Sequence, residues 1–158
     1  FRKFQATGLP LDHVNGHLSI HLHPTVFRLL MQNAERWGIR HMRLTCDEFR
    51  LNARLASGRW LYRVTHAGIY KWLSARSRPA LASRGIRHTD RVFGLLQNAR
   101  VDETYVTQLL QQLPPGDSEL YSHPSLDEFR HEFEALISPQ VKDLIRQHGI
   151  QLIRYQDL

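Results

Sequence analysis

Apolar residues recur along the chain at two alternating spacings. The alternation across residues 14–22 predicts a strand with Val14, Leu18 and Leu22 among its apolar positions. Pro24 ends this strand and can begin a helix, because its fixed φ suits the first helical turn. Apolar side chains then follow at helical spacing over residues 26–37, and Gly38 is a favourable helix end. Residues 39–44 predict a second, short strand.

The same pattern continues through the rest of the chain. The elements that we expect after the second strand are one or two helices in a basic region broken near Pro79 and Gly85, a strand or loop over 85–95 that ends at Gly94, a helix over 101–113, a strand over 118–121, helices over 126–137 and 139–148, and a last strand over 150–155. Strands that alternate with helices predict an α/β fold of parallel strands with helical crossovers. The histidines fall at the carboxyl ends of the expected strands, where such sheets usually carry their chemistry.

Length and composition are those of one ordinary globular domain. The chain has 158 residues, of which 42% are hydrophobic and 23% charged, and no apolar run approaches the roughly 18 residues that span a bilayer. It lacks an initiator Met and a signal peptide, so we expect it to begin partway through a longer protein or after processing. Its one cysteine, Cys46, excludes an internal disulfide, and we expect it to be a buried small hydrophobe in a reducing, cytoplasmic setting.

The net charge of +6 is concentrated in residues 54–91. This region has one acid, Asp90, and its basic residues are Arg54, Arg59, Arg63, Lys71, Arg76, Arg78, Arg84, Arg87 and Arg91. Trp60, Tyr62, Tyr70 and Trp72 lie among them. Three interpretations stay open: a solvated helix with an aromatic packing stripe, a surface for an anionic membrane, and, less favoured, a surface for nucleic acid.

Histidines gather in the first expected strand. Alternate side chains of a strand share a face, so a strand here would place His17, Ser19, His21 and His23 together. Neutral imidazole is the commonest protein ligand of divalent metals, which favours a metal or catalytic site. A hydrogen-bonded polar face is the alternative. His13 has the opposite parity and is expected to be an ordinary surface residue.

Residues 14–24 resemble the Asp-Ser-His-x-His-x-His-x-x-Pro signature of the YdjC-like carbohydrate deacetylases, with Asn15-Gly16 in place of Asp-Ser. His17 matches the first histidine, Ser19 replaces the second and His21 matches the third. A second segment, Glu119-Leu120-Tyr121-Ser122-His123-Pro124, resembles the family's Glu-Leu-x-x-His-Pro. Two further segments match the family in the same order: the expected strand over residues 39–43, which contains Arg43, and the Phe93-Gly94 pair. The Val-Asn-Gly-His variant and the basic middle are most similar to the branch associated with hopanoid biosynthesis.

The resemblance implies that residues 1–158 are the C-terminal part of a TIM-like (β/α) barrel, with a basic aromatic helical insertion at about 54–91. The family's Asn-Ala-Asp-Asp-Phe-Gly and Gly-x-His motifs, which supply two further metal ligands and a catalytic Asp, do not occur in the chain. By resemblance, His17 binds a divalent metal ion, Mg or Zn, and His123 is a catalytic acid or oxyanion stabiliser. A structural hydrogen bond is the alternative for His123.

Substrate contacts are assigned by the same resemblance. Arg43 and His21 are the candidates to bind substrate, and an ion pair of Arg43 with Asp47 or Glu48 is the alternative. The implied activity is metal-dependent deacetylation of N-acetylated sugars, on an oligosaccharide or a glycolipid such as an N-acetylglucosaminyl hopanoid. We expect the chain alone to be incomplete and inactive.

A half-barrel has open sheet edges, so we expect a homodimer or association with the missing N-terminal portion. We expect a cytoplasmic protein, peripheral at the inner membrane if it contacts lipid. One rival class is a basic binding module for a membrane surface or nucleic acid, with structural histidines. The other is a structural fragment with no activity, made by proteolysis or truncation.

Overall fold

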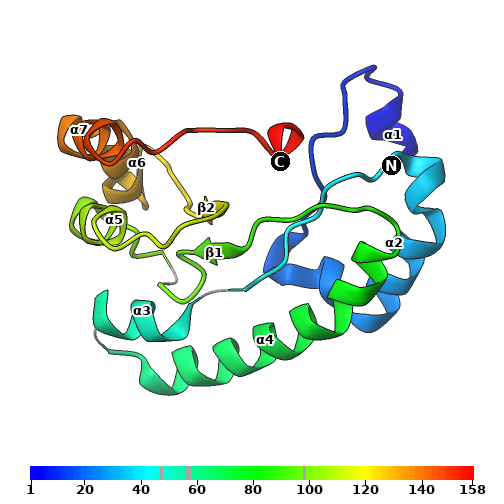
Figure 1. Ribbon diagram of the computed structural model, residues 1–158, viewed down its shortest axis with the longest axis horizontal. Helices are drawn as coiled ribbons and strands as arrows, with labels where there is room; N and C mark the ends of the chain where they lie inside the picture. The colour runs from blue at the N-terminus through cyan, green and yellow to red at the C-terminus, as the bar shows by residue number, and fades with distance from the viewer. Residues whose placement is uncertain (47, 56–57, 98) are drawn as a thin grey trace. The chain divides into compact units, whose positions relative to one another are not determined.

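The computed structural model describes residues 1–46, 48–55, 58–97 and 99–158, and the chain forms two compact units (Figure 1). The first unit comprises Phe1–Thr45, Trp72–Thr89 and Ile153–Leu158. The second comprises Cys46–Lys71 and Asp90–Leu152. One boundary between them falls inside a helix, α4 (Trp60–Ala82), rather than in a linker.

The other helices of the first unit are α1 (Arg2–Gln5), the 3-10 segment η1 (His17–Leu22), α2 (Pro24–Trp37) and the 3-10 turn η2 (Tyr155–Asp157). Helix α2 begins and ends as the sequence predicts. Pro24 occupies its first turn, and Gly38 closes it with φ of 67°, a left-handed conformation that glycine adopts at little cost. Its buried side chains join an apolar core that includes Leu22, Leu30, Met31, Met42, Leu44, Leu81 and Ile86.

Three backbone segments of the first unit lie in parallel. Val14 bridges to Met42, and His41 bridges to Arg87. The Val14 N–H donates to the His41 carbonyl at 3.0 Å, and the Met42 N–H donates to the Arg87 carbonyl at 3.0 Å. The second expected strand therefore pairs on both sides, although only at His41 and Met42.

Two strand predictions are wrong, one in this unit and one over residues 150–155, which cross from the second unit into the first. Beyond Val14, residues 17–22 form tight 3-10 turns in which Leu18 and Ser19 have left-handed φ values of 49° and 58°. The alternation misled because Leu18 and Ile20 are exposed while Leu22 enters the core, so the apolar positions do not share a buried face. Residues 150–155 form no strand either. Leu152 is 77% exposed, and the chain ends in η2.

The second unit contains α3 (Phe49–Leu55), β1 (Arg91–Phe93), α5 (Glu103–Leu110), β2 (Ser118–Leu120), α6 (Arg130–Ile137) and α7 (Pro139–Gln147). Strands β1 and β2 are parallel, with Val92 opposite Glu119, and the Val92 N–H donates to the Cys46 carbonyl at 3.0 Å. Helices α5, α6 and α7 pack together, as Figure 1 shows, on a core of Phe93, Val101, Val106, Leu109, Ala135 and Val141.

Local sequence explains where these helices begin. The Asp102 carboxylate accepts a hydrogen bond from the Tyr105 N–H at 2.8 Å, which caps α5. The Ser138 hydroxyl accepts from the Val141 N–H at 3.3 Å and Pro139 fills the next position, as the Ser-Pro pair predicts for α7. The predictions of helices over 101–113, 126–137 and 139–148 are thus confirmed, with shorter bounds.

Gly94 allows the chain to pass close to the end of β2. Its φ is 95°, and an added Cβ would lie 2.1 Å from the Tyr121 carbonyl oxygen. The Tyr121 N–H donates to the Phe93 carbonyl at 2.8 Å, so the two segments cannot separate to make room without losing this bond. Only glycine fits here.

The structure confirms a mixed α/β fold with parallel pairing and helical crossovers. Its only sheet with named strands, over the described residues, has two strands. Closure into a TIM-like barrel stays a prediction. Among the described helices, none combines the length and apolarity needed to cross a bilayer.

Candidate functional site

The residues predicted for the site are divided between the two units. His17, His21 and Arg43 belong to the first unit, and His123 belongs to the second. His17 is exposed on η1. Within residues 1–46, 48–55, 58–97 and 99–158, no three His, Cys, Asp or Glu side chains gather in a way that could hold a metal ion. These residues alone therefore do not build the metal centre that the resemblance implies.

His21 ties η1 to the neighbouring backbone. Its ring is buried, and Nε2 donates a hydrogen bond to the carbonyl oxygen of Arg43 at 2.9 Å. This contact fixes the conformation of the turn that carries His17. The ion-pair alternative for Arg43 named Asp47, which lies outside the described residues, and Glu48, which pairs with Arg91 at 3.2 Å.

His123 follows β2 at its carboxyl end, the position at which parallel sheets carry chemistry. Its Nε2 lies 2.7 Å from the Tyr121 hydroxyl, and the two rings meet edge to face with centroids 4.7 Å apart. The side chain is 41% exposed, so a ligand in solvent can reach it. A phenol can donate or accept, so this contact persists whether the imidazole is neutral or protonated.

A buried glutamate positions the backbone of His123. Glu132 of α6 has no exposed surface. Its Oε1 accepts from the Val101 N–H at 3.0 Å, and its Oε2 accepts from the backbone N–H of His123. The His123 Nδ1 lies 3.9 Å from the same Oε2, an ion pair when the ring is protonated. One carboxylate thus joins the start of α5, helix α6 and the segment after β2.

Sequence reasoning missed Glu132. Its one signal is that it lies three residues before Ala135, which is also fully buried, and so on the inward face of the predicted helix. A carboxylate on a buried face requires hydrogen-bond donors. Nothing in the linear order shows that those donors are the N–H groups of Val101 and His123.

A groove of about 820 Å³ lies in the second unit. Its lining is Cys46, Glu48, Phe49, Arg50, Val64, Ala67, Gly68, Lys71, Asp90 and Arg91. Cys46 is half-buried rather than buried as expected.

The pKa of Tyr62, on α4, is raised above its usual value of 10.0. Burial of the side chain is the main cause, Arg59 lowers the pKa in part, and Tyr121 raises it further.

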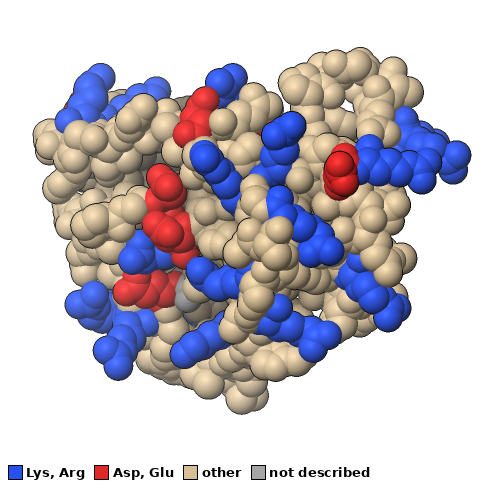
Figure 2. Space-filling model, turned by 45° about the vertical axis from the view of Figure 1, so that its right-hand side comes forward, with Lys and Arg blue, Asp and Glu red and all other residues tan. Residues whose placement is uncertain are grey.

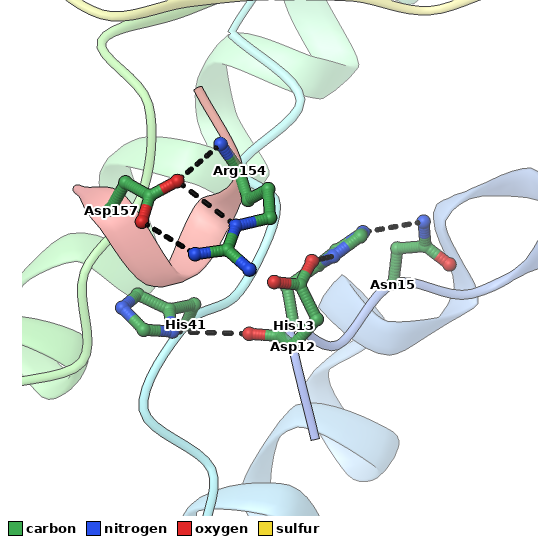
Figure 3. A network of polar contacts seen from close by, with 6 residues as sticks. All are labelled: Asp12, His13, Asn15, His41, Arg154 and Asp157. Atoms are coloured by element: carbon green, nitrogen blue, oxygen red, sulfur yellow. Dashed lines mark hydrogen bonds and ion pairs between the residues drawn. The ribbon is translucent and has the colours of Figure 1, made fainter. Parts of the chain in front are cut away.

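His13 also differs from its prediction as an ordinary surface residue. Figure 3 shows it among Asp12, Asn15 and His41. Its Nδ1 donates to the Asp12 carboxylate at 2.8 Å, while the Asn15 side-chain amide donates to Nε2 at 3.2 Å. The ring is also stacked on Tyr155, with centroids 4.1 Å apart. Both ring nitrogens are engaged, so this cluster is a structural tie within the first unit.

The remaining pair in Figure 3 is an ion pair at the end of the chain. The Arg154 guanidinium donates to both oxygens of Asp157, at 3.1 and 3.0 Å, and the Arg154 backbone N–H donates as well, at 2.9 Å. These hydrogen bonds lower the pKa of Asp157 from 3.8 to about 2. The pair stabilises the η2 turn.

Comparison with known families places most of the chain in a family match. Residues 1–147 match the family described as YdjC-like protein. The matched range contains every residue predicted for the site: His17, His21, Arg43 and His123. Comparison with curated proteins gave no match, and neither did comparison with solved structures.

Proposed function

Because the chain belongs to the YdjC-like family, whose members are carbohydrate deacetylase-type hydrolases and typically depend on a metal, we propose that it acts in removing acetyl groups from N-acetylated sugars. The match over residues 1–147 is the observation that carries this proposal. The narrower substrate that we propose is a glycolipid of the hopanoid type, on the Val14-Asn15-Gly16-His17 variant of the motif.

Amide hydrolysis needs a proton donor for the leaving nitrogen. Water adds to the acetyl carbonyl, the C–N bond breaks, and acetate and a protonated amine result. We assign the donor to His123. In support, its ring is reachable from solvent, its Nε2 contacts the amphoteric Tyr121 hydroxyl, and Glu132 holds its backbone in place. A group held in this way needs little reorganisation before it transfers a proton.

The metal, Mg or Zn in this proposal, would be bound by His17. The described residues gather no three-ligand group, so the roles proposed for His123, Tyr121 and Glu132 do not depend on the metal. Arg43 and His21 remain the proposed substrate contacts. The hydrogen bond between His21 and the Arg43 carbonyl holds these two positions together.

Acetate release from N-acetylated oligosaccharides and glycolipids tests the proposal, with the protein expressed from its complete reading frame and supplied with Mg²⁺ or Zn²⁺. His123→Gln should lower kcat about 10²–10⁴-fold, the usual contribution of a general acid. His148→Gln, at an exposed position after α7, is the matched control and should leave kcat unchanged. Equal turnover of His123→Gln and the unsubstituted protein would contradict the assignment.

Metal content separates the role of His17 from that of His123. His17→Ala should lower bound metal measured by mass spectrometry, whereas His123→Gln should retain it. The same His148→Gln variant provides the baseline. Metal retained in full by His17→Ala would remove His17 from the proposed ligands.

A further inference from the structure

Most buried positions of helix α4 are polar, with Leu81 as the apolar exception, whereas large apolar side chains are exposed over residues 60–72. Arg63, Ser74 and Ser77 are each at most 2% exposed. Trp60, Leu61, Val64, Ile69 and Trp72, which we call the apolar ridge, are all more than half exposed, and Leu61 reaches 80%. A helix on the surface of a water-soluble domain normally shows the reverse arrangement. The exposed side of α4 therefore has a composition suited to an apolar environment.

The ridge is continuous along the helix. At 100° per residue, Leu61, Val64, Gly68 and Trp72 follow one another at spacings of three or four on one side. Trp60 and Ile69 flank this line. Gly68 presents no side chain between Val64 and Trp72 and leaves the neighbouring groove of the second unit open beside it. Exposed apolar residues that cluster in this way mark an interaction surface more often than scattered ones do.

Cations border the ridge and acids are absent from this stretch of sequence. Residues 49–89 contain no Asp or Glu. The exposed cations beside the ridge are Arg59, Lys71, Arg76 and Arg78. The Arg76 guanidinium lies 5.9 Å from the centre of the Trp72 ring. Figure 2 shows that Lys and Arg side chains are more abundant than Asp and Glu on the face drawn there.

We propose that the apolar ridge of α4 binds to the surface of an anionic lipid membrane. Trp, Leu and Ile would enter the boundary between headgroups and acyl chains, and Arg59, Lys71, Arg76 and Arg78 would contact lipid phosphates. Tryptophan favours this interfacial depth. This inference does not depend on the deacetylase proposal.

Other occupants match the ridge less well. Nucleic acid would use the cations, but it gains nothing from Leu61, Val64 and Ile69. A second copy of the chain, related by a two-fold axis through this face, would bring the same cations close together. An anionic lipid surface complements both the hydrocarbon and the charge.

Co-sedimentation with lipid vesicles tests the proposal. The protein should bind vesicles that contain phosphatidylglycerol, bind pure phosphatidylcholine weakly, and dissociate as the salt concentration rises. Leu61→Ser combined with Trp72→Ser should weaken binding about tenfold or more, because two apolar side chains are lost from the contact. Leu126→Ser combined with Leu152→Ser removes two exposed leucines outside α4, 72% and 77% exposed, and should have no effect.

Charge reversal gives an independent measurement. Lys71→Glu should weaken binding to anionic vesicles at least fivefold, as expected from about 1 kcal/mol per cation near such a surface. Lys142→Glu, an equal change at an exposed position on α7, is the matched control. If the double serine variant misfolds by circular dichroism, Lys71→Glu still tests the idea without altering the ridge.

Tryptophan fluorescence locates the contact. Brominated lipids should quench Trp60 and Trp72 in the protein, and quenching should be lost in Trp60→Phe with Trp72→Phe although Trp37 remains. Binding that ignores lipid charge, or that survives both the ridge and Lys71 variants, would overturn the proposal. So would a ridge-dependent dimer, or oligonucleotide binding, in the absence of vesicle binding.

Discussion

Replacing Glu132 by alanine should cost more stability than any surface change on the same helix. The carboxylate is fully buried and accepts the N–H groups of Val101 and His123. Alanine removes both acceptor oxygens. The N–H groups of Val101 and His123 would then stay buried without an acceptor, or the loops that carry them would have to move to expose them to water. The matched variant is Glu134→Ala, two residues further along α6. Glu134 is exposed and pairs with Arg130 at 2.8 Å.

The expected magnitude follows from these contacts. A buried donor that loses its acceptor costs about 1–3 kcal/mol, so two such donors give a loss of roughly 2–6 kcal/mol. A typical domain has only about 5–15 kcal/mol of stability in total. An exposed pair one helical turn apart contributes about 0.3–0.5 kcal/mol, so Glu134→Ala should be almost silent. Glu132→Gln, which retains one acceptor oxygen, should fall between the two.

Urea denaturation followed by circular dichroism measures the free energy of unfolding, and amide hydrogen exchange shows where protection is lost. Protection of the Val101 and His123 amides should fall in Glu132→Ala and persist in Glu134→Ala. A loss below about 1 kcal/mol with both amides still protected would show that the carboxylate does not hold this loop. The assignment of a positioning role to Glu132 would then be wrong.

Three further predictions concern other parts of the chain. Arg154→Gln should raise the pKa of Asp157 from about 2 toward 3.8 in an NMR titration. In the unsubstituted protein, the stability that this pair contributes is present above pH 3.8 and is lost as the pH falls through about 2. An unchanged pKa would contradict that cause. Gly94→Ala should destabilise the second unit by more than about 3 kcal/mol, because its Cβ would meet the Tyr121 carbonyl. Gly85→Ala is the control: its φ is 62° but the space around it is open, so it should cost only about 1 kcal/mol. Equal losses of stability in the two variants would refute the steric argument. Light scattering should show that the 158-residue chain associates; a monomer at high concentration would contradict this expectation.

Helix boundaries were the most predictable part of the fold. Pro24, Gly38 and the Ser138-Pro139 pair mark helix ends through their own backbone chemistry, without help from distant residues. The strand over residues 14–22 was not predictable in the same way. A segment with alternating apolar positions forms a strand only if a neighbouring segment pairs with it, and within residues 14–22 only Val14 has such a partner. The His21 ring instead turns inward to the Arg43 carbonyl.

The site was predictable only where motif and position coincide. His123 follows a strand end, and the structure places it there. The predicted shared face of His17, Ser19 and His21 depended on the strand and is lost with it, because His17 is exposed and His21 is buried. Glu132 and the stacking of His13 on Tyr155 join residues far apart in the chain, so neither has a local signature.

The buried polar contact between α4 and α3 also affects how the helix responds to temperature. At the contact with α3, Arg63 donates to the Asn52 side-chain oxygen at 3.1 Å and also to the Asn52 backbone carbonyl, and both residues are buried. The rings of Phe49 and Trp60 also meet edge to face between the two helices, with centroids 6.3 Å apart, so the contact joins buried polar groups to a smaller apolar part than the cores contain. The heat-capacity change on separating α4 from α3 should therefore be smaller than the large positive change on melting the apolar cores. Heating or cooling should thus weaken the attachment of α4 to α3 along a flatter curve than the one that governs the rest of the domain.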